Sequence, residues 1–267
     1  MNVRSIGLAT ELSLVATRGQ IIDRGDYLAV RTPDDPSFYY GNALILPSPP
    51  QRGTVASWSR RFSEELGDNP EIRHVTLCWD GITGDAGARD ELEAAGFVIE
   101  TNQVMITEQL VDVVRPPGIR VLDTDELGAV GELAFAVSDR HDQAHWQFIQ
   151  RRTAWQRQLI ARGVAEFWGA FDGDQLVGSL GLVTLSGLAR YQDVQTATTH
   201  RKRGIASALL VAAGSRALAR GIERLVIIAM PETAAASFYQ RIGFRPIELT
   251  ASACRHPSSL SESAARS

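Results

Sequence analysis

The sequence predicts an α/β protein composed of two tandem copies of one fold. Strand-like and helix-like segments alternate along the second half of the 267-residue chain, and short stretches of the first half recur about 150 residues later. Between the halves lies Arg115-Pro116-Pro117-Gly118, which continues neither a helix nor a central strand. The predicted domains are therefore 1–114 and 118–256, and the small polar residues 257–267 are predicted to form a disordered tail.

Periodicity and turn signals predict each element of the second half. Apolar runs bounded by turn residues predict strands, and apolar residues three and four apart predict helices. The helix over 204–220 carries Ile205, Leu209 and Ala212 on one face and ends before Gly221. The Asp-Gly-Asp-Gln turn at 172–175 predicts a hairpin. The predicted order is β-α-α-β-β-β-α-β-α-β, over residues 119–122, 125–138, 141–162, 166–171, 176–182, 190–196, 204–220, 225–229, 232–241 and 244–251.

Three landmarks of the first half recur in the second. The stretch HVTLCWD around Val75 is similar to RLVIIAM around Val226, 151 residues later. Gly96-Phe97 corresponds to Gly243-Phe244, 147 residues later, and NALILPSPPQRGTVASW precedes DVQTATTHRKRGIASAL by about 150 residues. Landmarks at a nearly constant offset indicate duplication of one fold.

Composition and charge narrow the classes of function. The first 115 residues carry 10 arginines and 17 acidic residues, a net charge of −7; the rest carries 17 basic and 14 acidic residues, a net of +3. This balance lacks the broad basic face of a nucleic-acid-binding domain. No apolar stretch approaches the roughly 20 residues of a membrane span, and no signal peptide is evident, so a cytoplasmic protein is expected. The two cysteines have no CxxC spacing, which predicts neither a disulfide framework nor a zinc site.

The basic segment HRKRGIAS, residues 200–207, lies between a predicted strand and a predicted helix. A helix N-terminus offers free backbone N–H groups and a partial positive charge, so this turn is suited to bind an anion. Gly204 lets the backbone approach such an anion closely. The alternative is a solvated basic turn before an ordinary helix.

The context of this segment resembles a known superfamily. RxxGxA at 201–206 follows a strand, opens a helix and lies about thirty residues before ASFYQRIGF. Together these features resemble the GNAT (Gcn5-related N-acetyltransferase) superfamily, whose acyl-coenzyme A motif is Q/R-x-x-G-x-G/A. VQTxxxHRxxGIA at 194–206 and FYYGNALILPSPP in the first half are similar to its tandem-domain members. The resemblance covers 118–255 and implies a mixed, largely antiparallel sheet flanked by helices in each copy.

The resemblance also implies roles for matching residues. The backbone of 194–196 would pair with the pantetheine arm, amides of 201–207 would hold the pyrophosphate, and Tyr239 would protonate the departing thiolate. The alternative for Tyr239 is an ordinary core aromatic; the motif position favours the acid. Glu232 departs from the asparagine that many relatives have seven residues before this tyrosine. The implied cofactor-binding residues are Val194, Gln195, Thr196, Arg201, Lys202, Arg203, Gly204, Ile205, Ala206 and Ser207.

Two acidic residues are candidates for the base that removes a proton from an attacking amine. Asp193 lies on the strand that would flank the thioester, and Glu166 opens the preceding hairpin. The alternative for each is a solvated carboxylate at a strand edge. His141 and His145 have metal-ligand spacing on a helix, but no third ligand is evident and no metal is predicted.

The first copy is expected to bind no coenzyme A, because Pro49 and Pro50 lack the amide hydrogens that an anion would need. The predicted function is acetyl-CoA-dependent transfer of an acetyl group to a primary amine of a small molecule or peptide, within a ternary complex. The alternative is a non-catalytic acyl-CoA sensor or scaffold. Neither nucleic acid nor membrane is an expected partner, and the protein is expected to be a monomer or a homodimer.

Overall fold

The computed structural model describes residues 1–114, 116, 118–185 and 187–257. The chain forms two compact units: the first comprises Met1–Val104 with the described residues from Glu248 onward, and the second comprises Met105–Ile247. Within the described ranges, no helix is both long enough and apolar enough to cross a membrane.

The second unit has the predicted order of elements. Strands β6 to β9 pair antiparallel in succession, and β10 runs parallel to β9. The predicted α/β fold with a mixed, largely antiparallel sheet is therefore confirmed. Its elements are β6 (Ile119–Val121), α4 (Leu127–Val137), α5 (Gln143–Ala161), β7 (Ala165–Asp172), β8 (Gln175–Leu185), β9 (Leu188–Thr196), α6 (Ile205–Ala219), β10 (Arg224–Ala229), α7 (Ala234–Arg241) and the start of β11 (Arg245–Arg255).

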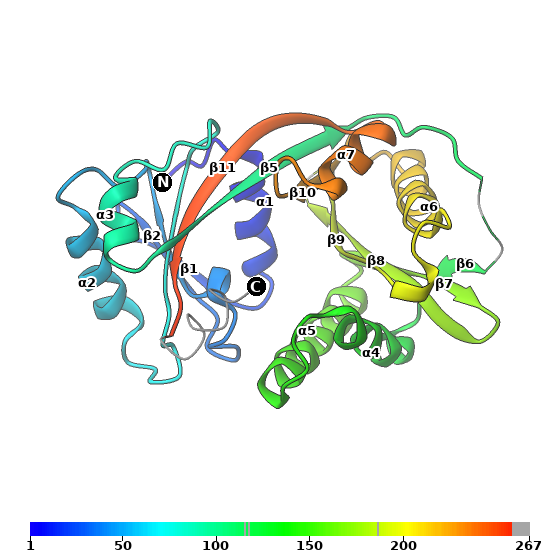
Figure 1. Cartoon of the computed structure of the whole chain (residues 1–267), viewed down its shortest axis with the longest axis horizontal. Helices are drawn as coiled ribbons and strands as arrows, with labels where there is room; N and C mark the ends of the chain where they lie inside the picture. Colours follow the sequence, from blue (N-terminus) through cyan, green and yellow to red (C-terminus); the bar gives the residue numbers. More distant parts are fainter. Residues whose placement is uncertain (115, 117, 186, 258–267) are drawn as a thin grey trace. The chain divides into compact units, whose positions relative to one another are not determined.

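Helices cover both faces of this sheet, with α4 and α5 on one face and α6 on the other (Figure 1). On β9, the Tyr191 hydroxyl donates to the carbonyl oxygen of Leu210 in α6 at 2.7 Å. Asp193, two residues later, instead accepts a hydrogen bond from Arg152 in α5. The main core lies on the α6 face and unites residues of the strands, α6 and α7, among them Leu180, Leu209, Leu225 and Phe244.

Local capping explains where two of these helices begin. Asp142 accepts the N–H of His145 at 2.8 Å, so α5 begins after it rather than at the predicted 141. Thr233 accepts the N–H of Ala236 at 3.2 Å, which moves the start of α7 past the predicted 232. Gly173, with φ +60°, turns the predicted hairpin between β7 and β8.

The first unit has the same succession of strands. β1 and β2 pair antiparallel, β2 and β3 pair antiparallel, and β3 and β4 pair parallel, as β7 to β10 do in the second unit. The helix α2 follows β3 as α6 follows β9, so the predicted tandem fold is confirmed. The elements of this unit are α1 (Ile6–Val15), β1 (Gln20–Asp23), β2 (Leu28–Arg31), β3 (Ala43–Leu46), α2 (Val55–Leu66), β4 (Val75–Trp79), α3 (Arg89–Ala94) and β5 (Val98–Thr107) up to Val104.

A buried carboxylate connects α2 to the hairpin of β1 and β2 in this unit. Glu65 accepts hydrogen bonds from Arg24 at 2.7 and 2.8 Å, from the Tyr27 hydroxyl at 2.8 Å and from Arg31 at 2.8 Å. The hydrogen bonds from Arg24 are the main reason that the Glu65 pKa falls to about 2. The ionised carboxylate is thus a fixed part of the first unit.

Strands β5 and β11 contribute residues to both units. In the first unit β11 pairs antiparallel with β4, placing Ser252 opposite Cys78, whereas Met105 near the end of β5 belongs to the core of the second. The two compact units thus have other bounds than the predicted domains 1–114 and 118–256. The predicted domains follow the two copies in the sequence, and they stay a prediction. Arg115 and Pro117 of the predicted boundary, and 258–267 of the predicted tail, lie outside the described residues.

Candidate functional site

Strands β9 and β10 pair at their beginnings and then separate. Residues 188–190 pair with 224–226, and no later residue of β9 has a partner on β10 within the described chain. β9 nevertheless stays paired with β8 as far as Thr196. Residues 192–196 are half-buried although they lie in the interior of the sheet. One edge of β9 therefore presents unpaired backbone groups to which an extended ligand can add as a strand.

The three residues predicted to flank pantetheine all lie on this separated part of β9. The side chain of Val194 packs against the main core of the unit. The amide of Gln195 donates to the Ser179 hydroxyl at 2.8 Å and to the Val130 carbonyl oxygen at 3.2 Å. Because these side chains pack within the unit, a ligand along the strand would be recognised by the backbone.

A β-bulge interrupts β9 at the same place. The register with β8 shifts between Ser179 and Gly181, so that β9 has one extra residue around Asp193 and Val194. Asp193 has φ +51°, in the left-handed region that residues with a side chain rarely adopt.

The carboxylate of Asp193 is held by α5. Arg152 donates to both of its oxygens, at 2.9 and 2.7 Å, and the Gln156 amide donates at 2.9 Å. The Arg152 and Asp193 side chains are only 22% and 26% exposed, so the ion pair is substantially shielded from water. The structure therefore places this predicted base in an ion pair instead of at a solvated edge. Sequence reasoning missed Arg152 and Gln156; their only signal is a four-residue spacing on one helix.

The segment between β9 and α6 presents an uncapped helix N-terminus. Gly204 precedes α6 with φ +78°, and it has no side chain to accept the N–H groups of the first turn. Lys202 is also left-handed, with φ +63°. A Cβ at position 204 would meet nothing closer than the Ser207 hydroxyl at 3.8 Å, so the backbone conformation, and not crowding, requires glycine here. Free N–H groups and the helix dipole suit this terminus to binding an anion.

The basic side chains around this terminus are exposed. Arg201, Lys202 and Arg203 form no ion pair with any described residue, and Arg201 reaches only the Thr196 carbonyl oxygen, at 3.5 Å. Their charges remain available to an anion. His200, by contrast, contacts Asp172 at 3.1 Å and is part of the fold.

Tyr239 lies on α7 with its ring in the main core. The residue is 8% exposed, and its ring lies near Phe238 and Phe244, with centroid distances of 5.4 and 6.2 Å. Burial raises the pKa of Tyr239 above its ordinary value near 10. The hydroxyl has no hydrogen-bond partner among the described residues, and its oxygen is not completely buried. The side chain is thus a core aromatic with an accessible, protonated hydroxyl.

Glu166 lies on the other face of the sheet from Asp193. It is opposite Leu182 on β8, which is opposite Tyr191, so it shares the α6 face. Its carboxylate accepts hydrogen bonds from Arg216 at 3.3 Å and from Arg220. The two predicted bases are therefore not brought together, and each is ion-paired.

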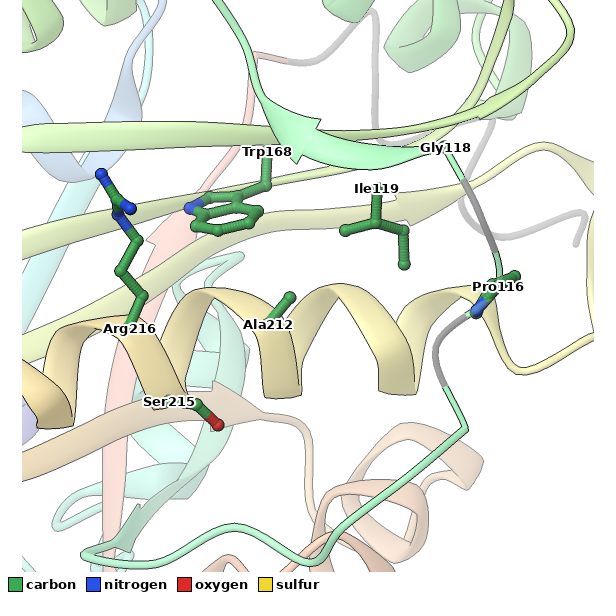
Figure 2. A pocket seen from close by; sticks show the side chains of 7 residues that line it. All are labelled: Pro116, Gly118, Ile119, Trp168, Ala212, Ser215 and Arg216. Atoms are coloured by element: carbon green, nitrogen blue, oxygen red, sulfur yellow. The ribbon is translucent and has the colours of Figure 1, made fainter.

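A pocket of about 450 Å³ lies between the sheet edge at β6 and α6, and Arg216, which contacts Glu166, is one of its lining residues. Figure 2 shows the Trp168 indole lying over α6 between Arg216 and Ile119. The α6 residues of this pocket, Ala212, Ser215 and Arg216, lie two or more turns beyond the helix N-terminus. It is thus distinct from the predicted cofactor segment.

A second pocket, of about 260 Å³, lies on the α4 and α5 face next to the bulge. Its walls on α4 are apolar, and the polar groups come from α5 and β9. It is lined by Val130, Gly131, Ala134, Val137, Ile149, Arg152, Thr153, Gln156, Asp193, Val194 and Gln195. This pocket borders the open edge of β9 through the residues at 193–195.

The corresponding place in the first unit is closed. β3 and β4 stay paired to the end of β3, with Leu46 opposite Trp79, and the Asp80 N–H donates to the Leu46 carbonyl oxygen at 2.9 Å. Gly53, with φ +80°, lies two residues before α2, whereas Gly204 directly precedes α6. Its N–H donates to both carboxylate oxygens of Glu91, at 2.9 and 2.8 Å. Sequence reasoning missed Glu91, which lies 38 residues away.

The histidines with metal-ligand spacing pack against an aromatic ring. His141 lies edge-on to Phe135, with a centroid distance of 5.2 Å, and His145 stacks on it at 6.1 Å. Burial lowers the pKa of His145. Across the described part of the chain, no group of three or more His, Cys, Asp or Glu residues is arranged to hold a metal ion.

Comparison with known proteins agrees with this geometry. Residues 163–246 match the family model of the acetyltransferase (GNAT) domain. The fold is similar to a functionally unknown conserved protein from Staphylococcus epidermidis, with a TM-score of 0.73 and 13% identity over 90% of this chain and 94% of that one. It is also similar to a GCN5-related N-acetyltransferase from Kribbella flavida, with a TM-score of 0.65 and 14% identity over 95% and 96% of the two chains.

A tandem GNAT protein from the clavulanic acid biosynthesis pathway has the same kind of fold, with a TM-score of 0.53 and 15% identity over 81% of this chain and 76% of that one. No curated protein matches the chain in sequence. Identities this low show the fold alone, whereas the family model identifies the domain at 163–246. The segment that matches the acetyltransferase (GNAT) domain model, residues 163–246, lies within the second unit.

Proposed function

We propose that the protein is an acetyl-CoA-dependent N-acyltransferase that acts on a primary amine of a small molecule or peptide, and that the second unit alone binds the acyl donor. The observation that carries the proposal is the open edge of β9, followed eight residues later by the uncapped N-terminus of α6. An elongated ligand with an anionic end fits that combination, and acyl-coenzyme A has this form.

The backbone supplies the binding groups. N–H and C=O groups at 194–196 hold the pantetheine arm as an added strand, and N–H groups of 204–207 hold the pyrophosphate. Arg201, Lys202 and Arg203 add positive charge, since no described residue neutralises them. When bound, the thioester supplies an activated acyl group.

Two groups of the chain assist the transfer itself. A backbone N–H of β9 near Val194 donates to the oxygen that becomes negative as the amine attacks. The Tyr239 hydroxyl donates a proton to the departing thiolate. Burial raises the pKa of Tyr239, which keeps it protonated at neutral pH. The base role predicted for Asp193 and Glu166 stays a prediction, and the ion pairs of both carboxylates weigh against it.

The pocket of about 260 Å³ beside the bulge is the proposed acceptor site. Its apolar α4 wall suits an aliphatic or aromatic body, and the residues at 193–195 put the pocket next to the strand where the thioester is proposed to lie. A pocket of this size accommodates a small amine or a single side chain of a peptide.

The first unit is proposed to bind no acyl donor. Its equivalent strands, β3 and β4, stay paired, and two prolines precede Gly53. The N–H of Gly53 already donates a hydrogen bond to the Glu91 carboxylate. A negatively charged phosphate at this position would be repelled by Glu91.

The decisive experiment has two stages. Calorimetric titration of the full chain with coenzyme A tests binding, and release of free thiol from acetyl-CoA in the presence of a panel of amines tests transfer. Binding with amine-dependent release supports the enzyme. Binding without release by any amine supports the non-catalytic sensor, and absence of binding overturns both.

A further inference from the structure

Asp193 lies at the point where the β9 strand departs from regular geometry. The extra residue of the bulge falls at Asp193 and Val194, and Asp193 is left-handed at φ +51°. Glycine adopts this conformation without steric cost, and asparagine and aspartate tolerate it better than alanine or β-branched residues. Something in the fold must therefore hold a residue with a side chain in this conformation.

The contacts of its carboxylate provide that restraint. Arg152 donates to both oxygens and Gln156 donates to one, so the carboxylate is fixed by three hydrogen bonds from a single helix. The donors are one turn apart on α5, a rigid element of 19 residues. With the carboxylate fixed on α5 and β9 paired to β8 on either side, the backbone at 193 has little freedom.

This restraint determines where the next peptide group points. A bulge changes the direction of the backbone N–H and C=O groups and the face on which the following side chains lie. Val194, directly after Asp193, begins the part of β9 proposed to hold the acyl donor and its developing oxyanion. The orientation of its N–H thus depends on the conformation of Asp193.

We propose that Asp193 is a positioning residue, held by Arg152 and Gln156, that sets the β9 bulge and thereby aligns the backbone for acyl transfer. It does not act as the base. The bidentate hydrogen bonds also explain why a carboxylate occupies this position, because its planar geometry matches the guanidinium group. This inference rests on the proposed function of the second unit.

Three substitutions at one position separate positioning from base catalysis. Asp193→Asn keeps one acceptor oxygen and the tolerance of the left-handed region, Asp193→Gly keeps only the conformational tolerance, and Asp193→Ala keeps neither. All three remove the carboxylate. We expect Asp193→Ala to lose about 10- to 100-fold in kcat/KM, and Asp193→Asn and Asp193→Gly to recover most of that loss. Equal and severe losses in all three variants would overturn the proposal in favour of a base.

The pH profile gives an independent readout. If Asp193 is the base, the dependence of kcat on pH should lose one inflection in Asp193→Asn. If Asp193 is a positioning residue, the shape of the plot of kcat against pH should stay the same. Coenzyme A affinity, measured by calorimetry, should weaken in Asp193→Ala and be restored in Asp193→Gly. A profile that changes in Asp193→Asn contradicts the positioning role.

A double variant tests whether Arg152 acts through Asp193. In the unmodified chain we expect Arg152→Met to reduce kcat/KM about as much as Asp193→Ala, and in the Asp193→Gly background to have little further effect. Additive effects would contradict the proposed coupling. Thermal unfolding of each variant identifies any that fails to fold. If the unmodified protein binds coenzyme A but releases no thiol with any amine, the proposed function fails and the affinities alone decide this inference.

Discussion

The carboxylate of Glu91 accepts the backbone N–H of Gly53 with both of its oxygens, at 2.9 and 2.8 Å. Gly53 corresponds to Gly204 of the second unit, and the two glycines have nearly the same backbone angle, with φ +80° and +78°. In the first unit the Glu91 carboxylate accepts a backbone N–H of the turn before the helix. In the second unit no side chain caps the corresponding helix. Both copies thus keep a left-handed glycine before the helix but differ in whether the turn can receive an external anion.

The pair of glycines provides a matched experiment. Alanine at either position strains a left-handed backbone by about 1 kcal/mol, and neither site has a close neighbour that would clash with the added methyl group. We expect Gly204→Ala to weaken coenzyme A binding about tenfold or more, because the methyl group lies where a phosphate must approach the backbone. Calorimetric titration measures the affinity. Gly53→Ala is the control and should bind coenzyme A as the unmodified chain does; equal losses in both variants would contradict this assignment.

Glu91 gives a prediction about stoichiometry. We expect one coenzyme A per chain, and still one in Glu91→Gln, because β3 and β4 remain paired even when the Gly53 N–H loses its charged acceptor. The variant should unfold at a slightly lower temperature, since an exposed charge-assisted hydrogen bond contributes on the order of 1 kcal/mol. Titration to saturation and scanning calorimetry measure these two quantities. Two bound molecules in either protein would show that the first unit is a functional site.

The order of elements in the second unit was predictable because its signals are local. Three such signals are the apolar spacing of α6, the turn at Gly173 and the segment before Gly204. Each is formed by residues that are close to one another in sequence. Local patterns of this kind determine which element forms. They also located the predicted cofactor segment.

The contacts of the candidate site were not predictable in the same way. Strand alternation could not give the direction of Asp193, because the bulge adds one residue and reverses the faces beyond it. Arg152 pairs with Asp193 across 41 residues, and no local pattern reports such a pair. Strand β11 extends past its predicted end at 251 to Arg255, because β4 of the first unit provides a pairing partner for those residues.

Tyr239 is expected to affect the chemical step and not donor binding. We expect Tyr239→Phe to lower kcat about 100-fold and to change KM for acetyl-CoA by less than a few-fold, because the variant keeps the ring in the core and removes only the proton donor. Since burial raises the pKa of Tyr239, ionisation of this group should cause no loss of activity below its ordinary pKa near 10. Steady-state thiol release between pH 6 and roughly 9.5 measures both effects.

The control for this variant is Tyr191→Phe. It also removes the hydroxyl of a buried tyrosine in the same unit, but that hydroxyl donates to the Leu210 carbonyl oxygen within the core. Its unfolding temperature should fall while kcat stays close to that of the unmodified chain. If the two variants lose kcat equally, the role of Tyr239 is in packing.

Glu65 gives the first unit a stability that depends on pH. Its hydrogen bonds to Arg24, Tyr27 and Arg31 lower its pKa from 4.5 to about 2 in the folded chain. A carboxyl with a lowered folded pKa contributes stability that is fully present above its unfolded pKa and is lost as the pH falls toward the folded value. At pH 7 we therefore expect Glu65→Gln to lower the free energy of unfolding by on the order of 2 kcal/mol. The difference from the unmodified chain should shrink between pH 5 and pH 2, roughly the window between the two pKa values. Urea unfolding across this range measures it.

Glu64→Gln, an exposed neighbour on the same helix, should change stability by less than about 0.5 kcal/mol at any of these pH values. A destabilisation by Glu65→Gln that is constant from pH 7 to pH 2 would show that the side chain contributes through packing and not through its charge.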